Sequence, residues 1–129
     1  MVYTISIGSN EQPKENLELA RKRLSELFPS ICFSLEEETK PLFFRRPNLF
    51  SNQVARFMSD WQATEVSSHL KAIEREAGRT LVDKQQEIIR LDIDLLACDS
   101  IIYKSEDLKR DYIVRGLEQL PFSDLPIHS

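Results

Sequence analysis

Apolar and polar positions follow two different periods along the chain, and these periods predict where strands and helices lie. Residues 2–7 form a β-branched run that ends in Gly-Ser-Asn, a pattern typical of a strand that enters a tight turn. In residues 13–28 the apolar positions recur at helical spacing with Lys and Glu between them, which predicts a surface helix. Alternation returns in residues 31–36 and predicts a second strand.

The second half of the chain repeats this order of strand, helix and strand. Residues 51–61 alternate and predict a third strand, and residues 64–77 carry an apolar stripe that predicts a helix ending at Gly78. Residues 79–89 are polar and have no steady period, so we expect a connection there. Residues 90–97, with the sequence RLDIDLLA, predict a strong strand.

The remaining segments near the C-terminus are expected to be short or irregular. Residues 101–103 follow a turn and are expected to pair as a hairpin, residues 109–120 to be helical in part, and residues 122–129 to pack irregularly. The order strand, helix, strand, strand, helix, strand predicts an α+β plait, in which helices cover one face of a mainly antiparallel sheet. That architecture assigns no function by itself.

Residues 39–49 are predicted to form a loop, because they carry two prolines, two adjacent aromatics and two adjacent arginines without a steady period. Phe43 and Phe44 have two interpretations. They pack under the loop as a small satellite core, or they form a mobile flap or partner surface. The residues alone favour the packed arrangement.

The size and charge of the chain limit the classes of protein to consider. Its 129 residues and 15.0 kDa are enough for one core and too few for two ordinary domains, so we expect one domain over residues 1–129. The net charge of −4 disfavours a nonspecific nucleic-acid binder, because phosphate contact needs a basic surface. No apolar run approaches the ~20 residues that span a bilayer, and the N-terminal sequence lacks a signal-peptide pattern.

The cysteines point to a reducing compartment. Cys32 and Cys98 are far apart in sequence, and each lies in an apolar run typical of a strand. This spacing suits neither a disulfide framework nor a C-x-x-C metal site, so we expect reduced, buried thiols. Together with the missing signal-peptide pattern, this predicts a cytoplasmic protein.

Asp92 and Asp94 are the strongest candidates for chemistry. Residues i and i+2 of a strand point to the same face with Cα atoms roughly 6.5 to 7 Å apart, so the two carboxylates are aimed at one place. A divalent cation would relieve their repulsion, and Mg²⁺ suits oxygen ligands without His or Cys. The alternative is the solvated face of an antiparallel sheet, on which D-x-D is an ordinary pattern. The strand alone gives the two interpretations equal weight.

Other catalytic motifs are absent from the sequence. It has three glycines, and they form neither a P-loop nor a G-x-G-x-x-G fingerprint. The two histidines, His69 and His128, leave little material for a Ser-His-Asp or H-E-x-x-H mechanism.

Five short motifs occur together in an order that characterises one enzyme family. They are Gly8-Ser9-Asn10, Phe50-x-Asn52, Glu74-x-x-x-Gly78-Arg79, Leu91-Asp92-Ile93-Asp94 and Arg115-Gly116. On these motifs the chain resembles the 6-hydroxymethyl-7,8-dihydropterin pyrophosphokinases of folate biosynthesis, over roughly residues 2–126. The resemblance implies a ferredoxin-like α/β plait on which ATP and a reduced pterin meet. It also implies that the β,γ-diphosphate of ATP moves in one step to the hydroxymethyl oxygen of the pterin, leaving AMP.

The resemblance also implies roles for residues on the pterin side. Asn52 would hydrogen-bond the amide edge of the pterin, because a carboxamide donates and accepts at once. Phe50 would stack near the ring. Thr39, Pro41 and Leu42 match a loop segment that supplies backbone hydrogen bonds and apolar contact to the pterin, and without the family they would be a plain turn.

On the nucleotide side, the resemblance implies that Asp92 and Asp94 hold two Mg²⁺ ions that bridge the ATP phosphates. Lys71 and Glu74 match positions that face the adenine and ribose, and without the family they would be a surface ion pair. Arg79 and Arg115 match cations beside the phosphates.

Several groups that the family usually carries are missing, and cations from elsewhere are expected to compensate for them. Ile89 stands where an Arg is common, Leu81 replaces another Arg, and Gln86 replaces a Trp that closes over the pterin. The His ahead of the last helix is also missing, and Lys109 stands at roughly its position. Candidate compensating cations are Lys109, Arg110, Arg90 and Lys84, and Phe43 or Phe44 would supply a stacking lid.

Two interpretations of function follow from this pattern. The first is an active, Mg²⁺-dependent pyrophosphokinase without a covalent enzyme intermediate. The second is a catalytically impaired relative that binds pterin or nucleotide, or acts as an interaction module. In either case we expect small-molecule partners, no nucleic acid, no membrane, and a monomer or weak dimer.

Overall fold

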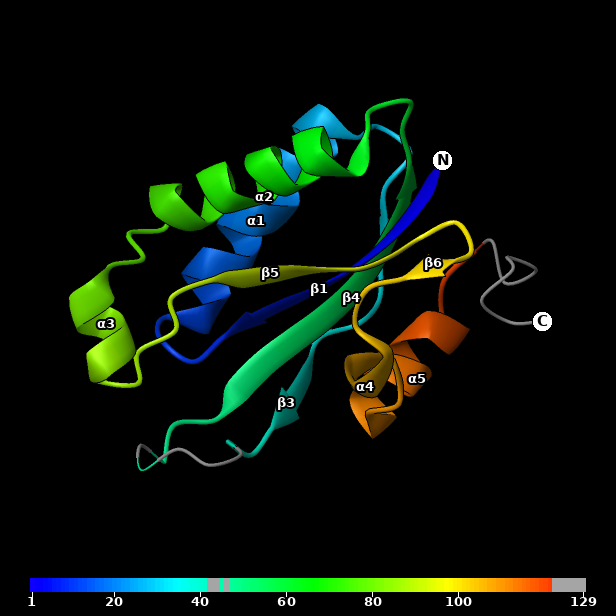
Figure 1. The fold of residues 1–129 in the computed structure, drawn as a ribbon. Helices are drawn as coiled ribbons and strands as arrows, with labels where there is room; N and C mark the ends of the chain where they lie inside the picture. The colour runs from blue at the N-terminus through cyan, green and yellow to red at the C-terminus, as the bar shows by residue number, and fades with distance from the viewer. Residues whose placement is uncertain (42–44, 46, 122–129) are drawn as a thin grey trace.

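The computed structural model describes residues 1–41, 45 and 47–121 (Figure 1). The predictions for Leu42, Phe43, Phe44 and residues 122–129 lie outside these residues. The elements, in chain order, are β1 (Val2–Ser9), α1 (Pro13–Leu27), β2 (Cys32–Phe33), β3 (Glu37–Thr39), β4 (Phe50–Met58), α2 (Ala63–Glu76), α3 (Leu81–Gln85), β5 (Asp92–Cys98), β6 (Ile101–Ile102), α4 (Ser105–Leu108) and α5 (Asp111–Glu118).

The strands form one antiparallel sheet in the order β2-β4-β1-β5-β6, and β3 also pairs with β4. The first strand therefore lies in the middle of the sheet, with β4 on one side and β5 on the other. Each long helix connects two strands that are not neighbours, which is the connectivity of a ferredoxin-like plait. The predicted α+β class and plait are confirmed.

Helices α1 and α2 lie next to each other and cover one face of the sheet (Figure 1). The inward residues of β1, Tyr3, Ile5 and Ile7, are at most 1% exposed there, and Leu17 and Leu24 of α1 are fully buried against them. Each such Leu or Ile side chain contributes roughly 1.5–3 kcal/mol by its removal from water. This face is the main core, and it fixes β1 and β5 beneath α2.

The opposite face is covered in part by α5, in addition to the face that α1 and α2 cover as predicted. Ile113 and Leu117 of α5 pack on Val54 of β4 and Leu96 of β5 in a second, smaller cluster. Gly116 permits this contact, because a Cβ at that position would lie 2.3 Å from the Cγ2 atom of Val54. The helical spacing of α5 shows that it is amphipathic, but not which face of the sheet it covers.

Three elements were not predicted, and one predicted strand is shorter than expected. Helix α3 lies in the predicted connection, and its Leu81 and Val82 are 81% and 59% exposed, so no buried stripe marks it. Strand β3 and helix α4 are short and polar and carry no period. Of the strand predicted over residues 31–36, only Cys32–Phe33 forms a strand, which pairs with β4, and Leu35 is 78% exposed. The separate β3 lies beyond that range and also pairs with β4.

No helix in the described part of the chain is long and apolar enough to cross a membrane.

Candidate functional site

The register of the sheet brings the family motifs into one row. Gly8 of β1 pairs with Asp92 of β5 on one side and with Asn52 of β4 on the other. Because Gly8 has no side chain, the strip of sheet between the carboxylate and the carboxamide stays open. A Cβ at Gly8 would lie 3.3 Å from Oδ1 of Asn52, which is a tight contact.

Asp92 and Asp94 share the face of the sheet that turns away from α1 and α2. Ile93 between them points to the opposite face, where its side chain is 5% exposed in the main core. This is the alternation expected of a strand, and it leaves both carboxylates half-buried beside the space between β5 and the C-terminal helices.

Asn10, the last residue of the first motif, fixes the segment that leads into β5. Its side chain is 2% exposed, and its Oδ1 accepts a hydrogen bond of 2.7 Å from the backbone N–H of Ile89. Its Nδ2 donates to the carbonyl of Glu87 at 3.0 Å. The motif therefore holds the approach to the two aspartates as well as the turn after β1.

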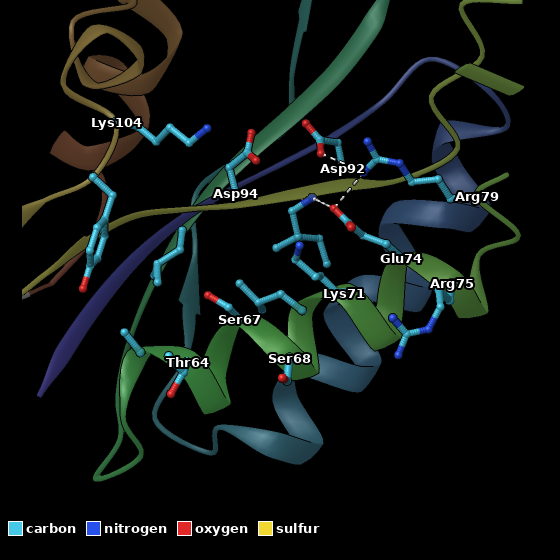
Figure 2. Close-up of a pocket in the computed structure, with 15 residues that line it drawn as sticks. Thr64, Ser67, Ser68, Lys71, Glu74, Arg75, Arg79, Asp92, Asp94 and Lys104 are labelled. Atoms are coloured by element: carbon cyan, nitrogen blue, oxygen red, sulfur yellow. Dashed lines mark hydrogen bonds and ion pairs between the residues drawn. The ribbon is translucent and has the colours of Figure 1, made fainter. Parts of the chain in front are cut away.

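Two pockets meet at these carboxylates. The first, of about 960 Å³, runs along α2 and the outer edge of β5 (Figure 2). The second, of about 660 Å³, lies over β1 and the start of β4, against α5. Three residues line both pockets, namely Arg79, Asp92 and Asp94. A group held in one pocket can therefore reach a group held in the other across the aspartate pair.

Arg79 bridges two carboxylates at this junction (Figure 2). Its Nη1 lies 3.0 Å from Oε2 of Glu74 and 3.1 Å from Oδ1 of Asp92. Glu74 also accepts a hydrogen bond of 2.8 Å from the backbone N–H of Ile93. Burial is the largest effect on Glu74 and raises its pKa to about 7, against the opposing effects of the Ile93 amide and Arg79.

Asp94 is held in an environment that disfavours its charge. Burial raises its pKa to about 6, and repulsion from the neighbouring Asp92 acts in the same direction. Lys104 opposes this shift, and Asp107 adds to it. A cation beside the pair would offset the repulsion, because it favours the ionised forms of both carboxylates.

The donor set suits Mg²⁺ that is shared with a substrate. Among residues 1–41, 45 and 47–121, no group of three or more His, Cys, Asp or Glu side chains could hold a metal ion. Mg²⁺ keeps several waters and is commonly bound by one or two carboxylates together with substrate phosphates. Asp92 and Asp94 match that pattern, and the remaining ligands would come from phosphate oxygens and water.

The pockets separate most of the predicted site residues into two sets. Lys71, Glu74 and Arg79 line the first pocket, as the nucleotide positions would. The second pocket is lined by the predicted pterin-side residues Thr39, Phe50 and Asn52 and by the predicted cations Lys109 and Arg110. Pro41 lines neither pocket.

Arg115 also lies outside both pockets. Its guanidinium forms a two-point ion pair with Glu37 of β3, in which Nε lies 3.0 Å from Oε1 and Nη2 contacts Oε2. The backbone carbonyl of Glu37 accepts a hydrogen bond of 3.1 Å from Nδ2 of Asn52. Arg115 therefore reaches the site only indirectly, through Glu37 of β3, whose carbonyl accepts from Asn52.

Of the residues that depart from the family pattern, one lines a pocket and two are exposed. Ile89 lines the second pocket, whereas Leu81 and Gln86 are exposed. Arg90, one of the expected compensating cations, donates from Nε to Oδ2 of the buried Asp83 at 2.7 Å. That pairing engages its charge within the segment between α2 and β5.

Sequence reasoning missed several residues that line the pockets. Lys104 lines the first pocket beside Asp94, and Tyr112 lines the second. Thr64, Ser67 and Ser68 give the first pocket a polar wall along α2 (Figure 2). Lys104 lies in the short connection between β6 and α4, directly before Ser105, and no motif marks it. The polar residues of α2 could have been found from the sequence, because the helical period places them off its apolar stripe.

Comparison with known proteins identifies the class of enzyme. The chain belongs to the family of 7,8-dihydro-6-hydroxymethylpterin-pyrophosphokinases (HPPK), whose family model matches residues 4–121 of its 129. Members of this family are pyrophosphokinases of folate biosynthesis, and they use ATP, Mg²⁺ and a reduced pterin. The predicted family is thus confirmed.

Other comparisons add little to this assignment. No curated protein sequence matches the chain. Among solved structures, a hydantoinase/carbamoylase family amidase from Burkholderia ambifaria is similar over 73% of this chain and 27% of its own, with 9% identity and a TM-score of 0.40. A likeness of this extent does not bear on the function of the chain.

Proposed function

We propose that the protein transfers the β,γ-diphosphate of ATP to the hydroxymethyl oxygen of 6-hydroxymethyl-7,8-dihydropterin. The observation that carries this proposal is the position of Asp92 and Asp94, which line both pockets at the point where the pockets meet. A transfer between two substrates needs such a junction, because the reacting groups must be held about 3–3.5 Å apart.

The first pocket supports a nucleotide with its phosphates towards the aspartate pair. Lys71 and the polar side chains of α2 line one part of it, and Arg79 and Lys104 bring positive charge beside Asp92 and Asp94. Adenosine then lies along α2, and the two cations contact the phosphates. Charge-assisted hydrogen bonds of this kind are roughly twice as strong as neutral ones.

The second pocket supports a flat heterocycle with hydrogen-bonding edges. Asn52 has a carboxamide at the floor, and the rings of Phe50 and Tyr112 line the walls. Nδ2 of Asn52 donates to Oγ1 of Thr39 at 2.8 Å, which orients the carboxamide. Because Nδ2 also donates to the carbonyl of Glu37, both of its N–H groups are engaged, and Oδ1 is left to accept from an N–H of the ligand. Aromatic rings contribute about 0.5–1.5 kcal/mol when they pack on another ring.

Catalysis in this arrangement is mainly positioning and charge neutralisation. The pterin oxygen forms a bond to the β-phosphorus, the bond from that phosphorus to the oxygen of the α-phosphate breaks, and AMP leaves. The proton of the hydroxyl passes to solvent water. Asp92 and Asp94 would hold Mg²⁺, which neutralises phosphate charge and acts as a Lewis acid when it is bound. Arg79 lines both pockets, Lys104 the first, and Lys109 and Arg110 the second, and these cations stabilise the charge that develops on the phosphates.

A second function is a relative that binds ligand without turnover. The residues that depart from the family pattern support this function. Ile89 lines the second pocket where the family commonly has an Arg, and Gln86, which replaces a Trp, is exposed. We favour the enzyme because both aspartates lie at the junction with Arg79, and three further basic side chains line one pocket or the other. We further predict that the protein releases AMP, binds small molecules as its partners and uses two Mg²⁺ ions. We also predict that it is cytoplasmic and is a monomer or weak dimer.

Two measurements on the same protein separate these functions. Thermal shift with a Mg²⁺–ATP analogue and with the pterin reports binding, because a ligand of the folded state raises Tm. AMP formation reports turnover. The enzyme predicts binding of both ligands and AMP that forms only when pterin is present. Binding of both ligands with AMP at background would instead identify the non-catalytic relative.

A further inference from the structure

We propose that Glu74 is a positioning residue, whose carboxylate fixes the backbone of β5 between Asp92 and Asp94 and keeps Arg79 at the junction of the pockets. This inference rests on the proposed function, because it assigns Glu74 a part in presenting the aspartates to metal and phosphate. It also differs from the role that family resemblance implies, in which Glu74 faces the nucleotide itself.

The outer edge of β5 shows why a residue is needed there. Strand β1 pairs with the inner edge of β5 from Asp92 onward, but β6 pairs only with Ala97 and Cys98. In the described part of the chain, the outer edge of the segment that carries the two aspartates thus has no strand partner. The N–H of Ile93 lies on this edge and donates to Oε2 of Glu74 at 2.8 Å. The Glu74 carboxylate therefore accepts the hydrogen bond that a carbonyl of a neighbouring strand would otherwise accept.

Ile93 is the residue through which Glu74 controls both carboxylates. Its side chain is 5% exposed in the main core, and its backbone N–H is held by Glu74. The two attachments lie on different sides of the backbone, so they restrict its rotation about the strand axis. Asp92 and Asp94 project from the flanking positions, and a rotation of Ile93 would move them both.

Glu74 has a second partner in Arg79. Nη1 of Arg79 lies 3.0 Å from Glu74 and 3.1 Å from Asp92, so one guanidinium is shared by a buried and a half-exposed carboxylate. A cation bound at Asp92 competes with Arg79 for the same oxygen atom. Glu74 is 9% exposed and lies behind the guanidinium, so it retains Arg79 while Asp92 changes partner. The arginine is then kept within reach of the phosphates.

Substitution of Glu74 separates its two contacts. Glu74→Gln keeps an oxygen that can accept from the Ile93 N–H but removes the charge that attracts Arg79. Glu74→Ala removes both contacts. Glu65→Gln is the matched control, because Glu65 lies in the first turn of the same helix, is exposed and lines neither pocket.

The first experiment measures amide hydrogen exchange at Ile93 by NMR on the Mg²⁺-free protein. We expect Glu74→Ala to increase the Ile93 exchange rate at least tenfold relative to that of Ile5, which reports the stability of the main core, while Glu74→Gln and Glu65→Gln stay near wild type. Unchanged protection of Ile93 in Glu74→Ala would overturn the inference. If Glu74→Ala does not fold, the second experiment decides through Glu74→Gln.

The second experiment measures the affinity for a Mg²⁺-bound, non-hydrolysable ATP analogue in a double-mutant cycle of Glu74→Gln with Arg79→Ala. We expect each single change to weaken binding about tenfold and the double variant to be little weaker than either, because Glu74 acts through Arg79. Additive losses would show that Glu74 contacts the nucleotide directly, and no loss would show that it does not matter. Both experiments read binding or exchange, so they keep their meaning if the wild type forms no AMP and the proposed function fails.

Discussion

Asp92 and Asn52 lie in one row of the sheet, on either side of Gly8. Neighbouring strands are about 4.7–4.9 Å apart, so this register separates the Cα atoms of Asp92 and Asn52 by about 10 Å, with Gly8 between them. A bicyclic substrate read by Asn52 would therefore extend over Gly8 towards the aspartate pair. The family motifs at the start, middle and end of the chain form one surface through this register.

The first prediction concerns the floor of the second pocket. In Gly8→Ala the new Cβ lies 3.3 Å from Oδ1 of Asn52, so the carboxamide must shift by a few tenths of an ångström. We expect the KM for pterin to rise about 3–10-fold, equivalent to about 1 kcal/mol, with the KM for ATP unchanged. Steady-state kinetics with each substrate varied in turn measures both constants. An equal rise in both would show that the substitution disturbs the whole sheet.

The second prediction concerns stability without metal. The pKa of Asp94 is raised from 3.8 to about 6, so the folded state binds its proton more tightly than the unfolded chain does. The resulting stability is present below about pH 4 and is lost as pH rises through about 6. Asp94→Asn never ionises, and we expect it to exceed wild type at pH 7 by roughly 1 kcal/mol after discounting for solvent screening.

Chemical denaturation in Mg²⁺-free buffer from pH 4 to pH 8 measures this difference. The control is Asp60→Asn, which makes the same substitution at an exposed position that lines neither pocket. Asp94→Asn should also lose the stabilisation that Mg²⁺ with a nucleotide analogue gives the wild type. An Asp94→Asn protein less stable than wild type at pH 7 would contradict the environment assigned to Asp94.

The third prediction concerns Lys104 as a cation for the phosphates. Lys104 lines the first pocket and favours the charged form of Asp94, so it lies where an ATP phosphate would approach the aspartates. We expect Lys104→Gln to weaken binding of the Mg²⁺–ATP analogue about tenfold, the loss of roughly one charge-assisted hydrogen bond. Calorimetric titration measures it, with the exposed Lys22→Gln of α1 as the charge-matched control. Equal affinities for the two variants would exclude Lys104 from the nucleotide site.

The fourth prediction distinguishes two roles of Arg115. Arg115 is paired with Glu37, whose carbonyl accepts from Asn52, so Arg115→Ala should loosen the strand beneath the carboxamide. We expect a severalfold rise in the KM for pterin and no change in nucleotide affinity, and the same result for Glu37→Gln. The opposite result, weaker nucleotide binding with an unchanged pterin KM, would show that Arg115 acts on the phosphates, as its position in the family implies.

The sequence was most informative where a single element determines the outcome. The period of residues 13–28 predicts α1, and the i, i+2 spacing of Asp92 and Asp94 puts both carboxylates on one face. These features depend on the geometry of one strand or helix, which the order of residues specifies directly. The family motifs added which residues gather around the aspartates.

Contacts between distant segments could not be predicted in this way. Arg115 and Glu37 are 78 residues apart, and no local pattern pairs them. Helix α5 is amphipathic, but its choice of face depends on the fit of Gly116 against Val54. From the sequence, Glu74 is expected only to pair with a cation on the helix surface. Its hydrogen bond to the Ile93 N–H becomes apparent only in the structure, where β6 does not pair with that part of β5. Each of these features is set by tertiary packing.

The most direct test of the account follows both transferred phosphates. Wild-type protein is given Mg²⁺, 6-hydroxymethyl-7,8-dihydropterin and ATP labelled at either the β- or the γ-phosphate, and the products are separated and counted. Both labels should appear in one pterin diphosphate, in equal amounts with AMP, and Asp94→Ala should abolish the product. Release of ADP, transfer of the γ-label alone, or full product formation by Asp94→Ala would contradict a diphosphate transfer centred on the aspartate pair.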